Sequence, residues 1–196
     1  MRYTDFVVFD PKVEQVAQDI LQVEFWRPEF CRILTETADS IDKYESRPED
    51  PVPGQELRID SISPDLYMSF CRHWKQTVQP TLEKFYGMPS SKWFVGWKVP
   101  FIIKYTPTTQ QELPLHWDDS LVTGTVKLNE DHDGGDLEFP RYGFSNRRCP
   151  VGSMLLWPSG IQHLHRSTPV TRGVKYSLVA WTKTDPKQSG IGYGDV

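Results

Sequence analysis

The chain lacks the features of exported and membrane-spanning proteins. Only 3 of its 196 residues are cysteines, Cys31, Cys71 and Cys149, and no two of them form a C-x-x-C pair. An odd number of widely spaced cysteines predicts neither a disulfide framework nor a zinc knuckle, and indicates reduced thiols. The N-terminal residues show no basic region followed by an apolar stretch, and no apolar run is long enough to cross a bilayer. We therefore expect a cytoplasmic protein without a membrane partner.

An excess of basic charge is also missing. The chain carries 22 Lys and Arg against 26 Asp and Glu, which gives a formal net charge of -4. Proteins that bind phosphate backbones normally present a basic surface, so we expect no nucleic-acid partner. No internal repeat is visible, and the length fits a single domain.

Aromatic residues and proline are plentiful, at 13% and 16 residues, which favours strands joined by turns. In the first part of the chain, however, apolar residues recur at helical spacing. The pattern predicts a short strand followed by three helices, the last kinked at Pro80: Phe6–Phe9, Val13–Val23, Pro28–Thr37 and Ser63–Phe85. The segment Tyr44–Gln55 is rich in proline and charge and is expected to be a loop.

From Trp93 onward the hydrophobic period changes to two, which is typical of strands. The expected strands are Trp93–Tyr105, Val122–Leu128, Gly135–Phe139, Ser153–Trp157, Ile161–His165 and Val174–Trp181. Helices first and many short strands afterwards predict an α+β fold. Its core would be a jelly roll, or double-stranded β-helix, flanked by N-terminal helices. We expect mostly helical support in residues 1–92, the jelly-roll core in 93–185 and a tail in 186–196.

The segment PLHWDDS, residues 114–120, places a histidine and a carboxylate two residues apart. In an extended chain such residues point to the same face, so His116 and Asp118 can hold a metal together. Trp117 would then point away from the metal and pack outside the inner sheet. Asp119 either attracts a cationic substrate or orients a metal ligand.

A third ligand is expected from His163 or His165, which lie two apart on a predicted strand. Two histidines and one carboxylate form the facial triad of non-haem Fe(II) oxygenases, which leaves positions open for a co-substrate and O2. Lys175 follows His165 by ten residues on the next predicted strand, where its ammonium can pair with a buried carboxylate of 2-oxoglutarate. This spacing favours His165 as the ligand. His163 would then support a ligand or face the substrate.

Four ordered motifs make the chain resemble the Fe(II)- and 2-oxoglutarate-dependent lysyl and prolyl hydroxylases, and most closely the catalytic domain of procollagen lysyl hydroxylases. They are FIIKYTP from Phe101, HWDDSLVTGTVKLN from His116, GGDLEF from Gly134 and PSGIQHLHRSTPVTRGVKY from Pro158. The resemblance covers residues 25–186.

The resemblance implies an oxygenase that hydroxylates a C–H bond of an amino-acid side chain and releases succinate and CO2. It implies Fe(II), 2-oxoglutarate and O2 as cofactors, with ascorbate as a candidate reductant, and His116, Asp118 and His165 as iron ligands. Lys175 would bind the distal carboxylate of 2-oxoglutarate with help from the Tyr105 hydroxyl, and Asn129 would line the same pocket. A peptide or a free small molecule is the expected substrate. A metal-binding barrel of the cupin type, without catalysis, is the alternative from another class.

Overall fold

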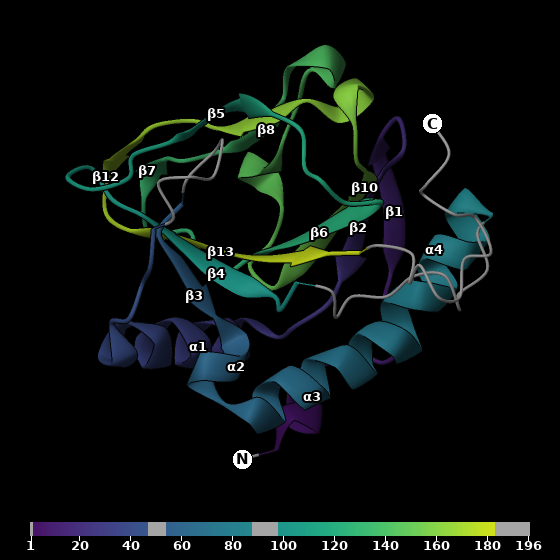
Figure 1. Ribbon diagram of the computed structural model, residues 1–196. Coiled ribbons are helices and arrows are strands. Elements are labelled where there is room, and N and C mark those ends of the chain that lie inside the picture. Colours follow the sequence, from purple (N-terminus) through teal and green to yellow (C-terminus); the bar gives the residue numbers. More distant parts are fainter. Residues whose placement is uncertain (1, 47–53, 88–97, 183–196) are drawn as a thin grey trace, which may run out of the picture.

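The computed structural model describes residues 2–46, 54–87 and 98–182. Its helices are α1 (Pro28–Ile41), α2 (Ile59–Ile62), α3 (Pro64–His73) and α4 (Gln79–Tyr86), and a π-helical turn at Trp74–Val78 joins the last two. They lie on one side of a large antiparallel sheet, and a smaller sheet lies on its other side (Figure 1). An α+β fold built mainly of antiparallel sheets is therefore confirmed.

The large sheet has the strand order β1-β2-β10-β6-β13-β4-β3. These strands are β1 (Val13–Ala17), β2 (Ile20–Glu24), β3 (Glu56–Arg58), β4 (Phe101–Tyr105), β6 (Val122–Lys127), β10 (Ser153–Pro158) and β13 (Lys175–Trp181). The small sheet has the order β5-β11-β8-β9, with β5 (Leu113–His116), β8 (Leu137–Phe139), β9 (Phe144–Ser145) and β11 (His165–Ser167). A third pair joins β7 (Asp133–Gly134) to β12 (Val170–Arg172).

Residue alternation gives the large sheet two different faces. On β13, Tyr176, Leu178 and Ala180 belong to the main apolar core beneath the helices. The intervening residues of the same strand point to the opposite face, toward the small sheet, where they border a cavity: Lys175, Ser177, Val179 and Trp181. Because side chains alternate along a strand, β13 contributes one set of residues to the apolar core and the other set to the cavity wall.

The helices pack closely on the sheet at Gly124. A Cβ atom at this position would lie 3.0 Å from the ring of Trp74, which is fully buried in the π-helical turn. The glycine therefore allows the indole to press directly on β6. Pro80 lies in the first turn of α4, directly after the π-helical turn, which is where a proline is expected to disturb a continuing helix. The predicted single helix Ser63–Phe85 is thus divided by the π-helical turn before Pro80.

Three expected elements differ from the structure. The predicted helix Val13–Val23 is wrong, because these residues form the β1–β2 hairpin, whose turn places Asp19 in the left-handed region at φ 56°. Val16, Ile20 and Val23 suit a helix by spacing, but hydrogen bonding of β2 to β10 buries Ile20 and Val23 in a sheet. The predicted strand Phe6–Phe9 is reduced to a single bridge between Val7 and Trp26.

The expected strand Ile161–His165 is also wrong for most of its length. Ile161–His163 form a 3-10 turn, and β11 begins only at His165. Part of the expected loop Tyr44–Gln55, the segment Trp93–Trp97 and the tail from residue 186 lie outside the described residues. Residues 1–92 contribute β1, β2 and β3 to the large sheet in addition to the helices. Among the residues described, no helix is both long and apolar enough to cross a bilayer.

Candidate metal centre and co-substrate pocket

Three side chains from separate segments converge between the two sheets. His116 ends β5, His165 begins β11, and the two residues are paired across the antiparallel ladder. Asp118 lies just beyond β5, with Oδ1 3.6 Å from Nε2 of His116 and Oδ2 3.4 Å from Nε2 of His165. One ligand atom from each residue lies within 4.8 Å of the others. The predicted triad is therefore assembled as a single group, whose atoms can converge on one ion.

Both imidazoles are held in the tautomer that a metal needs. Nδ1 of His116 donates to the carbonyl of Pro114 at 2.7 Å, and Nδ1 of His165 donates to the carbonyl of His163 at 3.0 Å. A proton held on Nδ1 leaves the lone pair of Nε2 free for coordination. Two imidazole nitrogens and one carboxylate suit Fe(II) with open positions, so the donor set fits the implied ion.

The charges of the triad also suit a cation. Burial disfavours the ionised form of Asp118, but hydrogen bonding to His116 and the nearby His165 outweigh burial and lower the pKa of its carboxyl. Burial lowers the pKa of His165. Burial opposes protonation of His116 as well, yet its hydrogen bond to Asp118 raises the pKa of this imidazole. The group therefore offers an ionised carboxylate beside two imidazoles, and these charges suit a cation.

Asp118 is held by the hydroxyl of Thr123, a residue of the large sheet, and two serine hydroxyls surround this contact. Thr123 on β6 donates through Oγ1 to Oδ2 of Asp118 at 2.6 Å. Its Oγ1 also lies 2.9 Å from Ser120 Oγ and 3.2 Å from Ser159 Oγ. A carboxylate fixed through one oxygen presents the other in a defined direction. Thr123 was not predicted from sequence, although its position five residues after Asp118 on an expected strand was a usable signal.

Thr123→Val should weaken metal binding by about 10- to 100-fold, because valine keeps the shape of threonine but cannot orient the ligand carboxylate. Metal affinity measured by competition with a coloured chelator checks this, and Thr123→Ser, which keeps the hydroxyl, should restore most of the affinity. An unchanged affinity in the valine variant would contradict a positioning role for Thr123.

The triad faces a cavity of about 400 Å³ between the sheets. Apolar and aromatic side chains make up most of its wall, which keeps bulk water away from a bound ion. The lining includes Phe101, Ile103, Tyr105, Leu113, Leu137, Trp157, Val179 and Trp181, together with the triad, Thr123, Thr125, Ser167 and Lys175. The same cavity is therefore bordered both by the triad and by Lys175, at the N-terminal end of β13.

Lys175 lies at that end of the cavity and is 5% exposed. Its Nζ donates to Ser167 Oγ at 2.7 Å and lies 4.3 Å from the ring centre of Tyr105. Burial lowers the pKa of this amine to about 7, and the charge of Asp136 opposes the shift. The structure thus places a buried amine, a hydroxyl and the predicted Tyr105 together in the same cavity as the triad. Ser167 was missed by the sequence analysis.

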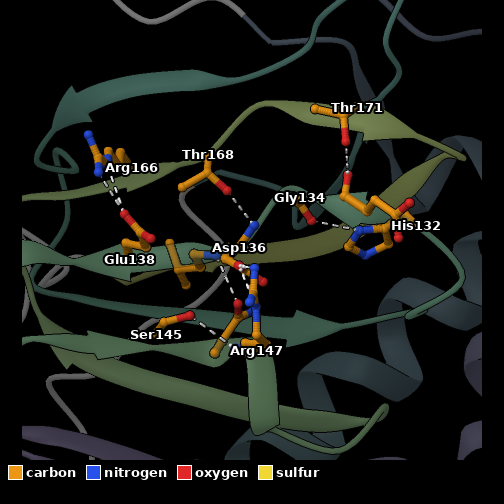
Figure 2. A network of polar contacts seen from close by, with 12 residues as sticks. His132, Gly134, Asp136, Glu138, Ser145, Arg147, Arg166, Thr168 and Thr171 are labelled. Carbon is orange, nitrogen blue, oxygen red and sulfur yellow. Dashed lines mark hydrogen bonds and ion pairs between the residues drawn. The ribbon is translucent and has the colours of Figure 1, made fainter.

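Polar contacts hold the backbone of residues 132–136 (Figure 2). Nδ1 of His132 donates to the carbonyl of Gly134. The carboxylate of Asp136 accepts a hydrogen bond from Nε of Arg147 at 2.9 Å, and the backbone N–H of Asp136 donates to the hydroxyl of Thr168. Between Gly134 and Asp136, Gly135 has φ +72°, and a Cβ there would lie 2.8 Å from Cγ2 of Val170 and 2.9 Å from Cδ of Lys175. The glycine therefore gives the lysine stem its space.

Gly135→Ala is expected to weaken 2-oxoglutarate binding by about tenfold, since the methyl group displaces Lys175 and strains a left-handed residue. Calorimetric titration measures this change. Gly143→Ala is the matched control: it has φ +58° but nothing within 4 Å of an added Cβ, so it carries the backbone strain without the collision. Equal losses in both variants would contradict a specific effect on Lys175.

The other predicted residues are placed differently. His163 is buried outside the residues that border the cavity, with its ring 5.4 Å from that of Tyr142, so it does not face the triad. Asn129 also lies away from this cavity: its Nδ2 donates to the carbonyl of Val174 and its Oδ1 accepts from the N–H of Tyr176. Asp119 borders the cavity.

The expectation that Trp117 packs outside the inner sheet is wrong. Its side chain is 57% exposed and borders the cavity. The physical reason is that β5 ends at His116, so strand alternation no longer governs the residues that follow. Asp118 likewise reaches the triad from beyond the strand, where it is held by Thr123.

The fold and the triad together define the class of mononuclear non-haem metal sites with two histidines and one carboxylate. Residues 101–183 match the family model described as the 2OG-Fe(II) oxygenase superfamily, and this segment holds the triad and Lys175. The predicted resemblance to Fe(II)/2-oxoglutarate oxygenases of the lysyl and prolyl hydroxylase type is confirmed by the relatives that follow.

Curated relatives include procollagen-lysine,2-oxoglutarate 5-dioxygenase 1 of Mus musculus, 28% identical over 173 residues, which are 80% of this chain and 23% of the relative. A multifunctional procollagen lysine hydroxylase and glycosyltransferase of Caenorhabditis elegans is 24% identical over 189 residues, covering 86% of this chain and 24% of the relative. The chain thus spans about a quarter of the length of the curated relatives it matches.

Solved structures show the same fold. A viral collagen prolyl hydroxylase from Paramecium Bursaria Chlorella virus-1 superimposes with a TM-score of 0.64 at 16% identity, covering 85% of this chain and 96% of that one. A prolyl-4-hydroxylase of Pseudomonas putida gives a TM-score of 0.57 at 20% identity, with 85% and 93% covered.

Proposed function

We propose that the protein is an Fe(II)- and 2-oxoglutarate-dependent hydroxylase of an amino-acid side chain, in a peptide or in a small molecule. The observation that carries this proposal is one cavity holding two unlike sites: the His116–Asp118–His165 triad and the buried amine of Lys175. A metal-binding site without a co-substrate does not require a buried cation such as Lys175. A dicarboxylate that chelates the ion through one end does require one, because its other carboxylate would otherwise be buried without a partner of opposite charge.

Each residue has a distinct task in this proposal. His116, Asp118 and His165 would hold Fe(II), which supplies the activation of O2 for C–H hydroxylation with release of succinate and CO2. Lys175 and Ser167 would bind the distal carboxylate of 2-oxoglutarate, and the neutral Tyr105 would close the pocket around it. Apolar walls such as Ile103 and Leu137 would exclude water from the reacting centre. Thr123 would keep the ligand carboxylate oriented.

The two facing sheets support the proposal that the core is a double-stranded β-helix. Cys31, Cys71 and Cys149 are all free thiols, which supports a reducing compartment such as the cytoplasm. The curated relatives are named as procollagen lysine hydroxylases, and the solved neighbours as prolyl hydroxylases. These names favour a side chain presented within a peptide over a free metabolite.

The proposal is tested by loading the protein with Fe(II), adding 2-oxoglutarate and ascorbate, and measuring succinate. Lysine, arginine and proline, both free and in peptides, are then screened for a mass gain of one oxygen. The inactive analogue N-oxalylglycine should compete with 2-oxoglutarate. A protein that binds a divalent ion but neither produces succinate nor binds N-oxalylglycine would be a non-catalytic metal-binding barrel, and the proposal would be rejected.

The affinity for 2-oxoglutarate should depend on pH through Lys175. Only its protonated form attracts a carboxylate, so the affinity should be constant below pH 7 and fall by up to about tenfold per pH unit above it. His132, whose pKa is lowered by burial, and Tyr105, whose pKa is raised by burial, both stay neutral just above pH 7. Calorimetry between pH 6 and 9 measures the slope. The Lys175→Met protein should give a flat profile, and an equal slope there would refute the assignment.

A further inference from the structure

In the cavity that holds the triad, the side chain of Lys98 is enclosed by three groups of the protein. Its Nζ lies 4.1 Å from the ring centre of Phe101 and 4.2 Å from that of Trp181. Oε2 of Glu56 lies 3.5 Å from the same nitrogen, and the side chains of Lys98 and Glu56 are only 22% and 16% exposed. All four residues border the cavity that holds the triad.

Phe101, Trp181 and Glu56 together have the chemistry of an ammonium receptor. The faces of aromatic rings attract a cation, and the attraction grows as water is removed. A carboxylate at the edge adds a charge-assisted contact. We call these three residues the ammonium box. In the structure the box is filled by an ammonium that belongs to the chain itself.

Trp181, one wall of the ammonium box, lies near the metal ligands and at the opposite end of β13 from the co-substrate amine. Trp181 ends β13 and is paired with Thr123, whose hydroxyl holds Asp118. Lys175 begins the same strand, so the two ends of β13 serve different sites. A substrate ammonium in contact with Trp181 would therefore lie toward the metal ligands and away from Lys175.

We propose that Glu56, Phe101 and Trp181 form a substrate subsite for an alkylammonium group, and that Lys98 is an internal occupant which the substrate displaces. This inference rests on the proposed function of the same cavity and adds to it the class of substrate and a built-in competitor. Lys98 precedes β4 and reaches the box through a flexible four-carbon stem, so it can leave without moving the strand.

The arrangement selects against other substrates through Glu56. If a neutral or acidic group displaced Lys98, this carboxylate would lose its ion pair with Lys98 in a largely buried position, which is unfavourable. A substrate ammonium replaces both the ion pair and the ring contacts. A ligand must therefore compete with the ammonium of Lys98 for the box, and only a cation of similar shape can replace its contacts.

The competition is measurable with n-butylammonium as the probe. Calorimetry is performed on the full chain with Mn(II) and N-oxalylglycine present, so that the metal side of the cavity is filled. Removing an occupant that fills the box nine-tenths of the time raises the apparent affinity about tenfold. We therefore expect Lys98→Ala to bind n-butylammonium about tenfold more tightly than the wild type, and Lys98→Arg, which keeps a cation in the box, to bind it no more tightly than the wild type.

Two further comparisons test whether the gain in affinity depends on the charge of the ligand and on the carboxylate of Glu56. The double variant Lys98→Ala/Glu56→Gln should lose the gain, and 1-butanol should show no gain in any variant. If Lys98→Ala binds n-butylammonium no more tightly than the wild type, the inference is overturned. It is also overturned if the wild type binds butyrate and Lys98→Ala does not, because Lys98 would then be a receptor for anionic substrates. Thermal unfolding of each variant confirms that the protein is folded.

The inference and the proposed function fail in different ways. Succinate formation without n-butylammonium tests the oxygenase and does not involve the box. A protein that produces succinate but shows no tightening in Lys98→Ala retains its function and loses the subsite. Tightening without succinate supports an ammonium site in a protein that is not an oxygenase.

Discussion

Asp118→Ala is expected to reduce metal affinity and 2-oxoglutarate turnover by more than about 100-fold. Asp118 is the only anionic member of the triad, and its two oxygens face both imidazoles at 3.6 and 3.4 Å. Removing it leaves two neutral nitrogen donors, which cannot offset the charge of a divalent ion in a largely apolar cavity. Equilibrium dialysis with Fe(II) under anaerobic conditions measures the affinity, and succinate formation measures the turnover.

The matched control for this variant is His163→Gln. His163 is as buried as the ligands and lies two residues before His165, but its side chain is outside the cavity. Its contribution to the site is the backbone carbonyl that accepts from His165, which a side-chain replacement retains. Metal affinity within threefold of the wild type is expected. Full metal binding by Asp118→Ala, or loss of binding in His163→Gln, would show that the ligands are wrongly assigned.

The ligands were predictable because each rests on short-range sequence information. His116 and Asp118 lie within one segment, and the ten-residue interval between His165 and Lys175 selects His165 over His163. The reason for that selection is visible only in the structure: the 3-10 turn at Ile161–His163 interrupts the expected strand, so the two histidines do not share a face. A pattern of alternation holds only as far as the strand itself extends.

The positioning groups were not predictable in the same way. Thr123 reaches Asp118 across the short segment that joins Asp118 to β6, and Ser167 meets Lys175 across the gap between the two sheets. Serine is common on strands, so the sequence carries no signal of the contact between Ser167 and Lys175, and the only signal for Thr123 is its position five residues after Asp118. The same limit explains the β1–β2 hairpin, whose stability comes from hydrogen bonding of β2 to β10, more than 120 residues later.

Lys175→Met is expected to change binding and stability in opposite directions. The affinity for 2-oxoglutarate should fall by about 30-fold or more, because a co-substrate carboxylate would be buried without a cation. Without ligand, the same variant should be more stable than the wild type by about 1–4 kcal/mol near pH 6, since it replaces a buried amine by an apolar side chain of similar length. Calorimetric titration and thermal unfolding measure the two effects.

The sign of the stability change follows from the pKa of Lys175. Burial lowers it from 10.5 to about 7, so the unfolded chain binds the proton more strongly than the folded one. The penalty is fully present below pH 7 and disappears as the pH rises toward 10.5, which means that the advantage of Lys175→Met should shrink over the same interval. Lys104→Met is the control, because Lys104 lies on the neighbouring β4 but pairs with Asp39 on the helical side of the sheet. If Lys175→Met kept wild-type affinity for 2-oxoglutarate, the amine would have no part in co-substrate binding, and the second of the two sites on which the proposed function depends would be lost.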